Sequence, residues 1–371
     1  MRLAFLRSLY RARGPFVSVY LDVSRDTENA PKEIELRWRA ARETLAAQGA
    51  DAATLDAAER AVGSLELPAG RPEGPQGQVI FAAGGRVVFT DLLPDPPRRE
   101  IARFSPLPHA MPYLAQRGER IPYLRVVIDR LGADIVAVSA DGLARTAKTK
   151  GDDYPVHKPR GGEWANRRYH EAAEHLWLHN AIDAAAEVER MALRSAAEVL
   201  VVSGDRQASR MMIEHLRESL RDRVVETESG SRADGSATAA LDAELVRAAR
   251  DLAARHSDAV LDAYQRELGQ RDRATEGLAD TVVALQRGQV ETLLLNDDPS
   301  SVAELRIGPE PAQLAYADAE LRELGVRDPA ADRADAALVR ALVGTDGELV
   351  TVPDDAATLT DGVGALLRYP L

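Results

Sequence analysis

Three short runs rich in β-branched and apolar residues lie between residues 123 and 148, and they constrain the fold more than any other part of the chain. The runs cover residues 123–129, 133–139 and 143–148. Only tight turns fit between them, so we expect neighbouring antiparallel strands. A sheet of this kind buries its apolar faces under other elements. The middle of the chain is therefore expected to build a sheet packed against helices.

The residues that follow supply such helices. An apolar stripe at helical spacing predicts one long helix from about residue 164 to 197. A buried strand over 198–203, a helix over 205–221 and a strand over 224–227 are expected next. Together these patterns predict an α/β sandwich with the loop that precedes the long helix projecting from one end.

The parts of the chain on either side of this sandwich mix helix and strand patterns in the same way. Before it, the sequence predicts a strand over 16–23, helices over 31–47 and 51–62, a hairpin over 78–90 with Gly84 and Gly85 at its turn, and a connection over 94–122. After it come helices over 237–271, 275–287, 311–324 and 333–343 and strands over 290–295 and 348–352. These patterns predict three α/β domains, at residues 1–120, 121–272 and 273–371.

Charge is distributed unevenly along the chain. The sequence has 47 Lys+Arg against 59 Asp+Glu, a formal net charge of -12. Between residues 143 and 170 the balance reverses, because seven basic residues face three acidic ones. Local positive charge on an acidic protein is typical of docking at one anionic site, with nucleic acid as the first choice. The alternative is a solvated loop. The basic residues are Arg145, Lys148, Lys150, Lys158, Arg160, Arg167 and Arg168.

The centre of this basic segment is the pair Gly161-Gly162 followed by Glu163. Adjacent glycines adopt backbone angles that are closed to other residues, so the tip can thread a narrow polar site where a side chain would clash. The tip runs directly into the predicted long helix. This arrangement indicates a loop that is inserted into a partner.

Several classes of protein are excluded by what the sequence lacks. Without cysteine there are no disulfides, thiolate metal sites or cysteine nucleophiles. No apolar run approaches the length that spans a membrane, and charge interrupts the first residues before a signal-peptide core can form. We therefore expect a cytoplasmic protein without a cofactor.

Two metal hypotheses arise from the distribution of ionisable residues. His170, Glu171, His175 and His179 lie within a few turns of the predicted helix, but the zincin spacing fails because Glu174 stands four residues after His170. No metal site is expected there. A second set, Asp129, Asp134 and Asp141, could hold Mg²⁺ for a nuclease, although aspartate after a strand is also a common turn residue.

The domain order and the glycine-paired loop that leads into a long helix resemble the archaeal and eukaryotic class-one release factor and Pelota superfamily. The segment Ala274-Thr-Glu-Gly-Leu-Ala-Asp-Thr-Val-Val-Ala-Leu-Gln-Arg-Gly-Gln-Val-Glu-Thr-Leu-Leu-Leu295 is similar to its C-terminal domain. Within the superfamily the chain looks most like the bacterial branch with the Balon-type ribosome hibernation factors and the Vms-type peptidyl-tRNA hydrolases.

The resemblance implies a function for the loop tip. Release factors carry Gly-Gly-Gln there, and the tip enters the peptidyl-transferase centre and helps water attack peptidyl-tRNA. Here Gly161 and Gly162 match, while Glu163 stands at the glutamine position. Catalysis is therefore left open: an ionised carboxylate donates no hydrogen bond, yet Glu163 could act as a general base.

The implied function is that of a ribosome-associated factor that occupies the A site as a hibernation or protection factor in stress. A peptidyl-tRNA hydrolase is the alternative, and the Mg²⁺-dependent nuclease with Asp129, Asp134 and Asp141 is the third hypothesis. The implied partners are rRNA and P-site tRNA, with a translational GTPase as a companion, and the protein is expected to be a monomer off the ribosome. The residues expected to contact RNA are His157, Lys158, Arg160, Gly161, Gly162, Glu163, Trp164, Arg167 and Arg168, with Trp164 either stacking on a base or packing at the helix start.

Overall fold

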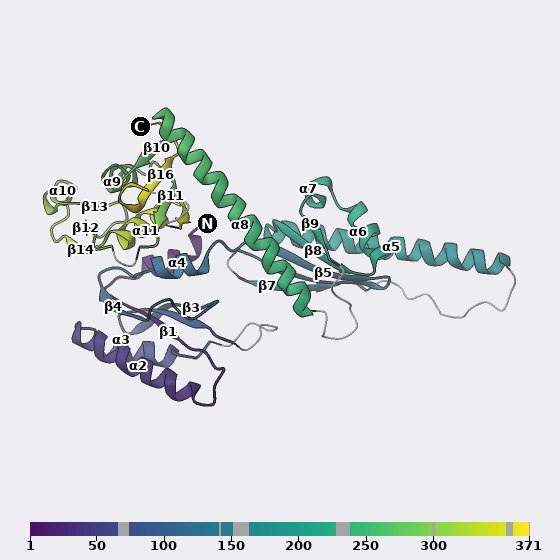
Figure 1. The fold of residues 1–371 in the computed structure, drawn as a ribbon, viewed down its shortest axis with the longest axis horizontal. Coiled ribbons are helices and arrows are strands. Elements are labelled where there is room, and N and C mark those ends of the chain that lie inside the picture. Colours follow the sequence, from purple (N-terminus) through teal and green to yellow (C-terminus); the bar gives the residue numbers. More distant parts are fainter. Residues whose placement is uncertain are drawn as a thin grey trace. The chain divides into compact units, whose positions relative to one another are not determined.

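A computed structural model describes residues 1–65, 74–140, 142–150, 163–227, 238–298, 301–353 and 359–370. For residues 163–173 and 238–240 the description is limited to the helical backbone. The chain forms two compact units. Unit 1 joins Met1–Gly118 to Ala259–Leu371, and unit 2 comprises Glu119–Asp258. The mixed α/β fold class is confirmed (Figure 1), while the three-domain division stays a prediction.

The N-terminal part of unit 1 is an antiparallel sheet of order β3-β2-β1-β4. Its strands are β1 (Phe16–Asp22), β2 (Gly77–Ala83), β3 (Arg86–Leu93) and β4 (Ile101–Ser105), and its helices are η1 (Ala4–Leu6), α1 (Arg7–Arg11), α2 (Ala30–Ala47), α3 (Ala52–Ala61) and α4 (Met111–Arg117). Alternate residues of β1 are buried on opposite faces. Val17 and Val19 pack with Trp38 of α2, and Tyr20 packs with residues of α1 and α4.

The C-terminal part of unit 1 holds two further sheets. The first has the order β10-β16-β11-β15, with β11 and β15 parallel, and the second has the order β13-β12-β14. The elements are β10 (Ala274–Glu276), α9 (Leu278–Gln286), β11 (Val290–Asn296), β12 (Glu304–Ile307), β13 (Leu314–Ala315), α10 (Asp318–Glu323), β14 (Ala330–Arg333), α11 (Ala334–Gly344), β15 (Glu348–Val352), η3 (Thr360–Gly362) and β16 (Val363–Leu367). One continuous apolar core contains side chains from both parts of unit 1, such as Phe81 and Leu338.

Unit 2 is a five-stranded sheet of order β7-β6-β5-β8-β9, covered by helices on both faces. Strands β5 to β7 are antiparallel, as predicted, whereas β5, β8 and β9 run parallel. Helices α5 and α6 cover one face, and the first part of α8 packs on the other. The elements are β5 (Tyr123–Asp129), β6 (Gly132–Val138), β7 (Ala144–Lys148), α5 (Glu163–Ser195), β8 (Val199–Gly204), α6 (Arg206–His215), α7 (Glu218–Arg221), β9 (Val224–Glu226) and α8 (Thr238–Gln270).

Some predicted elements differ from those observed. The predicted connection over 94–122 was wrong, because it contains β4 and α4, and β4 completes the first sheet by pairing with β1. The single helix predicted over 205–221 is two helices, since Leu216 and Arg217 have extended backbone angles. Within the described residues, no helix is long and apolar enough to cross a membrane.

Unit 1 contains a buried histidine, and we expect it to make the stability of this unit depend on pH. His109 is 8% exposed, and its pKa is lowered to about 4. Burial is the largest cause, Asp335 opposes it, and Arg333 and Arg103 act in the same direction as burial. The unfolded chain binds the proton near pH 6.5, so the free energy of unfolding should fall by about 1.4 kcal/mol per pH unit from pH 6.5 downward and level off near pH 4.

Urea unfolding between pH 7 and pH 4 measures this effect. His109→Gln should remove that part of the slope, whereas a matched change at the exposed His175 should leave it in place. A His109→Gln slope equal to that of the parent protein would contradict the assignment.

Candidate nucleic-acid interface

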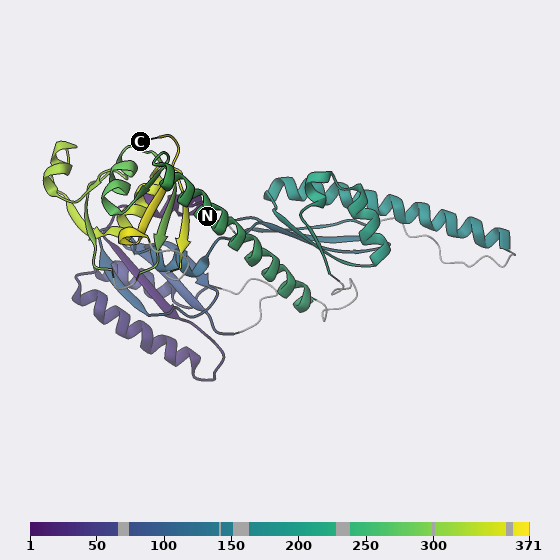
Figure 2. The ribbon, with the colours of Figure 1, turned by 45° about the horizontal axis from the view of Figure 1, so that its top comes forward.

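Helix α5 extends away from the core of unit 2 at its N-terminal end (Figure 1). The helix begins at Glu163, directly after Gly161 and Gly162. Among its described side chains, the first buried one is Asn180. Residues 163–179 therefore extend about 26 Å before the helix reaches the core, at 1.5 Å per residue. Figures 1 and 2 both show α5 continuing well past the strands of its own sheet.

The chain leaves the sheet toward the loop from the end of β7. There Thr149 donates its backbone N–H to the carbonyl of Ala133, and its hydroxyl accepts from the Ala133 N–H, both at 2.8 Å. Lys148 and Lys150 are exposed beside this anchor, and Lys148 Nζ lies 3.6 Å from Asp134 Oδ1. The basic segment is thus hydrogen-bonded to β6 at Thr149, and the two lysine side chains on either side are exposed to solvent.

The nine residues predicted to contact RNA stay predictions. His157, Lys158, Arg160, Gly161 and Gly162 lie outside the described residues. The other four, Glu163, Trp164, Arg167 and Arg168, lie in the first turns of α5, of which the backbone is described. Positions 164, 167 and 168 have the spacing that places residues on one face of a helix.

A cluster that the sequence analysis did not identify holds α5 at its base. The guanidinium carbon of Arg130 lies 4.2 Å from the ring centroid of Trp177, and Arg130 Nε lies 3.2 Å from Asp205 Oδ2. Asn180 Nδ2 donates to the Arg130 carbonyl at 2.9 Å. The only sequence signal was aspartate at the predicted start of a helix. Indeed, Asp205 Oδ1 accepts from the N–H groups of Gln207 and Ala208, each at 3.0 Å.

Gly204 explains how Asp205 reaches this position. Its φ of +121° is in the region that favours glycine, and a Cβ there would lie 1.9 Å from the carbonyl oxygen of Ile128. The backbone of β8 therefore passes against the end of β5 where only glycine fits. As a result Asp205 lies beside Arg130, which follows the last residue of β5.

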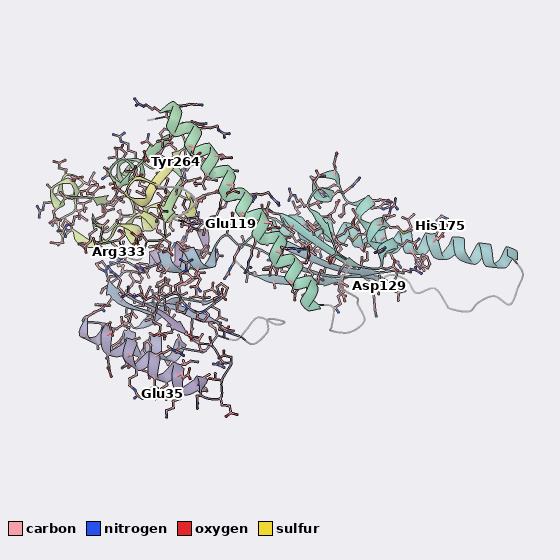
Figure 3. The ribbon with its side chains drawn as sticks, in the orientation of Figure 1. Glu35, Glu119, Asp129, His175, Tyr264 and Arg333 are labelled. Atoms are coloured by element: carbon pink, nitrogen blue, oxygen red, sulfur yellow. The ribbon has the colours of Figure 1, made fainter. Side chains whose placement is uncertain are left out.

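The carboxylates of the nuclease hypothesis have structural roles where they are described. Asp129, at the end of β5 (Figure 3), accepts the Leu131 N–H at 2.8 Å, which is turn chemistry. Asp134 pairs with Lys148, and Asp141 lies outside the described residues. His179 lies 3.7 Å from Asp183 of its own helix. The described residues contain no group of three His, Cys, Asp or Glu side chains arranged to hold a metal ion.

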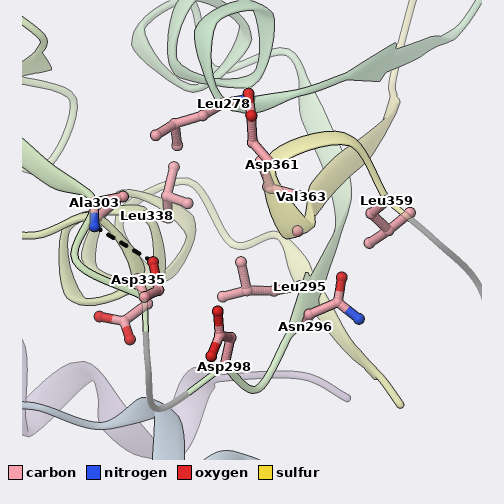
Figure 4. Close-up of a pocket in the computed structure, with 13 residues that line it drawn as sticks. Leu278, Leu295, Asn296, Asp298, Ala303, Asp335, Leu338, Leu359, Asp361 and Val363 are labelled. Atoms are coloured by element: carbon pink, nitrogen blue, oxygen red, sulfur yellow. Dashed lines mark hydrogen bonds between the residues drawn. The ribbon is translucent and has the colours of Figure 1, made fainter. Parts of the chain in front are cut away.

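A pocket of about 490 Å³ lies in unit 1 between the end of β11 and the starts of α9 and α11 (Figure 4). Its polar side chains serve the fold. Asp335 is ion-paired with Arg333 at 2.7 Å, Asp361 accepts the Leu278 N–H at 3.2 Å, and Asn296 donates to the Val352 carbonyl at 2.9 Å. These contacts stabilise strand and helix ends.

Comparisons with known sequences identify relatives of this chain. The model of bacterial archaeo-eukaryotic release factor family 2 matches residues 122–270. The uncharacterized protein Rv2629 of Mycobacterium tuberculosis strain H37Rv is 31% identical over 379 residues, covering 100% of this chain and 97% of that protein. The uncharacterized protein MT2704 of strain CDC 1551 matches with the same identity and coverage.

Among solved structures, the archaeal translation termination factor aRF1 is similar at 15% identity, covers 98% of this chain and 96% of its own, and has a TM-score of 0.28. Archaeoglobus fulgidus Pelota is 14% identical, with 79% of each chain covered and a TM-score of 0.33. A chain from a model of ribosome-bound archaeal Pelota and ABCE1 is 17% identical, with 99% and 94% covered and a TM-score of 0.42.

Proposed function

This chain belongs to the bacterial branch of the archaeo-eukaryotic release factor and Pelota superfamily, and on that premise we propose that it is a ribosome-associated factor that occupies the A site. Its loop tip, Gly161-Gly162-Glu163, lies near the peptidyl-transferase centre in this proposal. The factor protects idle ribosomes in hibernation rather than ending translation. Its surroundings there are rRNA and the CCA end of P-site tRNA.

The reach of α5 is the observation that carries the proposal. A binding site inside a ribosomal cavity has to be reached by something long and narrow. A single helix with its side chains is about 10–12 Å wide, and residues 163–179 add about 26 Å of length beyond the core. Paired glycines at the end of such a helix let the backbone approach RNA closely. The N-terminal part of α5 is thus long and narrow enough to support insertion of the predicted tip into such a cavity.

The charge of the basic segment supports RNA as the partner. Phosphate contacts from Lys158, Arg160, Arg167 and Arg168 position the loop, and Trp164 or His157 stack on unpaired bases. The remainder of the protein is acidic and repels a polyanion, so binding is confined to this segment.

Glu163 decides between protection and hydrolysis. It is the first residue of α5, and a glutamate side chain is ordinarily ionised near neutral pH. A carboxylate in this form accepts hydrogen bonds but donates none, so it cannot replace the amide of a Gly-Gly-Gln tip. Binding without turnover is therefore the function that the position of Glu163 favours.

One observation favours the alternative, a peptidyl-tRNA hydrolase. The first N–H groups of a helix have no partner within the helix, and the backbone N–H of Glu163 is among them. An N–H at that point can stabilise an oxyanion as the ester is attacked, independent of the side chain. A release assay on ribosomes therefore decides between the two functions.

Further parts of the proposal concern the rest of the molecule. Residues 1–120 face the decoding site, residues 121–272 carry the tip, and residues 273–371 form the third domain. The protein works in the cytoplasm as a monomer off the ribosome, with a translational GTPase as its companion. None of these steps requires a cofactor.

Binding to 70S ribosomes at a series of salt concentrations tests the proposal. The slope of log affinity against log salt is negative, and Lys158→Ala combined with Arg160→Ala should reduce its magnitude by about 2, because two phosphate contacts are lost. Arg210→Ala is the matched control, since Arg210 pairs with Glu214 on its own helix. If the parent protein does not sediment with ribosomes even at low salt, the proposal is wrong.

A further inference from the structure

The projecting part of α5 acts as a lever, so small motions at its base become large at its tip. Residues 163–179 extend about 26 Å, and a tilt of about 10° at the base would move Glu163 by about 4 Å. Misplacement of a functional group by about 1 Å can cost a hundredfold in activity. A tip that works at a fixed point inside a partner therefore requires a rigid base.

The cluster around Arg130 lies at that base. Among the described side chains of α5, Trp177 is the most N-terminal one with a polar or ring contact to another element. Asn180, the first buried residue among the described side chains of the helix, follows one turn later and donates to the Arg130 carbonyl. Trp177 and Asn180 therefore both contact Arg130: Trp177 contacts its guanidinium group, and Asn180 contacts its backbone carbonyl.

Arg130 is in turn fixed from the side of the sheet. It follows the last residue of β5, and its Nε pairs with Asp205 Oδ2 at 3.2 Å. The other oxygen of Asp205 caps α6, so the carboxylate cannot rotate without losing two hydrogen bonds. The planar guanidinium group stacks on Trp177 while its edge meets the carboxylate, a combination that lysine cannot make.

We propose that Arg130 is a positioning residue, which fixes the direction of the projecting part of α5 by clamping Trp177 to the capped start of α6. The proposed function enters only in the purpose of this role, which is to point the projecting part of α5 at its site on the ribosome. The clamp itself is a property of unit 2 and can be measured without a ribosome.

Spin-label distances measure the direction of the helix directly. The chain has no cysteine, so Glu174→Cys on α5 and Ser219→Cys on α7 give two clean labelling sites, both exposed and both in unit 2. The parent protein should give a narrow distance distribution. Arg130→Ala and Trp177→Ala should each broaden it, and Trp177→Phe, which keeps a ring under the guanidinium group, should restore it. Arg130→Lys keeps the charge but not the stack and should stay broad.

The control is Arg210→Ala, which removes an arginine from α6 that does not contact α5 in any described pair. Circular dichroism of each variant checks that the helix and strand content of the whole chain matches that of the parent, and the Trp177 pair of variants remains informative if Arg130→Ala does not fold. An unchanged distribution in folded Arg130→Ala or folded Trp177→Ala would overturn the proposal.

Ribosome binding adds the functional readout. Arg130→Ala should weaken 70S binding about tenfold while the slope of log affinity against log salt stays that of the parent, because no phosphate contact is removed. Broad distances with parent-like affinity would show that the clamp exists but does not serve ribosome binding, and the positioning role would fall. A parent protein that does not bind ribosomes would refute the proposed function and leave the distance result standing.

Discussion

Replacing Glu163 with Gln is expected to raise peptidyl-tRNA hydrolysis on ribosomes by at least about a hundredfold, the size of effect that one well-placed donor has on acyl transfer. The change keeps the length of the side chain and replaces an anionic acceptor with a neutral amide that donates two hydrogen bonds. Glutamate and glutamine have similar helix propensities, so α5 should still begin at this position. Gly161 and Gly162 are unchanged, so the tip of the variant should enter the same site as that of the parent protein.

The measurement is the release of labelled peptide from 70S complexes with peptidyl-tRNA in the P site, at saturating protein. Glu163→Ala is the control, since it removes the carboxylate without adding a donor and should bind without release. Rapid release by the parent protein would establish the hydrolase and end the hibernation proposal. Release that disappears in Glu163→Ala would assign the activity to the side chain as general base, and release that persists would assign it to the backbone N–H. If Glu163→Gln binds as tightly as the parent but releases nothing, the tip does not lie at the peptidyl-transferase centre.

The sequence predicted those elements whose signal is local. The runs that became β5, β6 and β7 were identified because β-branched residues and tight turns stand next to each other. The long helices α5 and α8 were identified because an apolar stripe persists over many turns. In these segments the neighbours along the chain are also the neighbours in the fold.

Elements that depend on distant partners were missed. Strand β4 is five residues long between proline-bearing stretches, and only its pairing with β1 makes it a strand. Strands β12, β13 and β14 have only four, two and four residues, and they form a small sheet by pairing with one another. The sequence of such a short apolar run does not show whether it forms a strand or a helix, because that depends on the elements it packs against.

The same limit applies to the candidate site. The sequence predicts the loop tip, because paired glycines and a reversal of charge are visible in a short window, and the tip stays a prediction since Gly161 and Gly162 lie outside the described residues. The sequence did not show that Arg130, Trp177 and Asp205 meet, since arginine, tryptophan and aspartate are common residues and their contacts follow from the course of β5, α5 and β8. The sequence therefore predicted the tip but not the contacts of Arg130 with Trp177 and Asp205 at the base of α5.

A buried carboxylate joins the two parts of unit 1, and its removal should destabilise that unit strongly. The side chain of Asp332 is 1% exposed and accepts from Arg103 Nη2 and from the Leu107 N–H, each at 2.7 Å. Asp332→Ala leaves Arg103 without its carboxylate and the Leu107 N–H without an acceptor. Breaking such a pair costs about 3–5 kcal/mol, and the lower end applies because the Arg103 side chain is 34% exposed.

Tryptophan fluorescence can report this loss for unit 1 alone. The chain has three tryptophans, so Trp164→Phe with Trp177→Phe leaves Trp38, which is 5% exposed in the core of unit 1. In that background Asp332→Ala should lower the free energy of unfolding in urea by about 3 kcal/mol. Glu35→Ala, which removes an exposed pair with Arg39, should stay within about 0.5 kcal/mol of the parent. A loss below about 1 kcal/mol for Asp332→Ala would mean that the apolar core shared by Phe81 and Leu338 holds the two parts together without the ion pair.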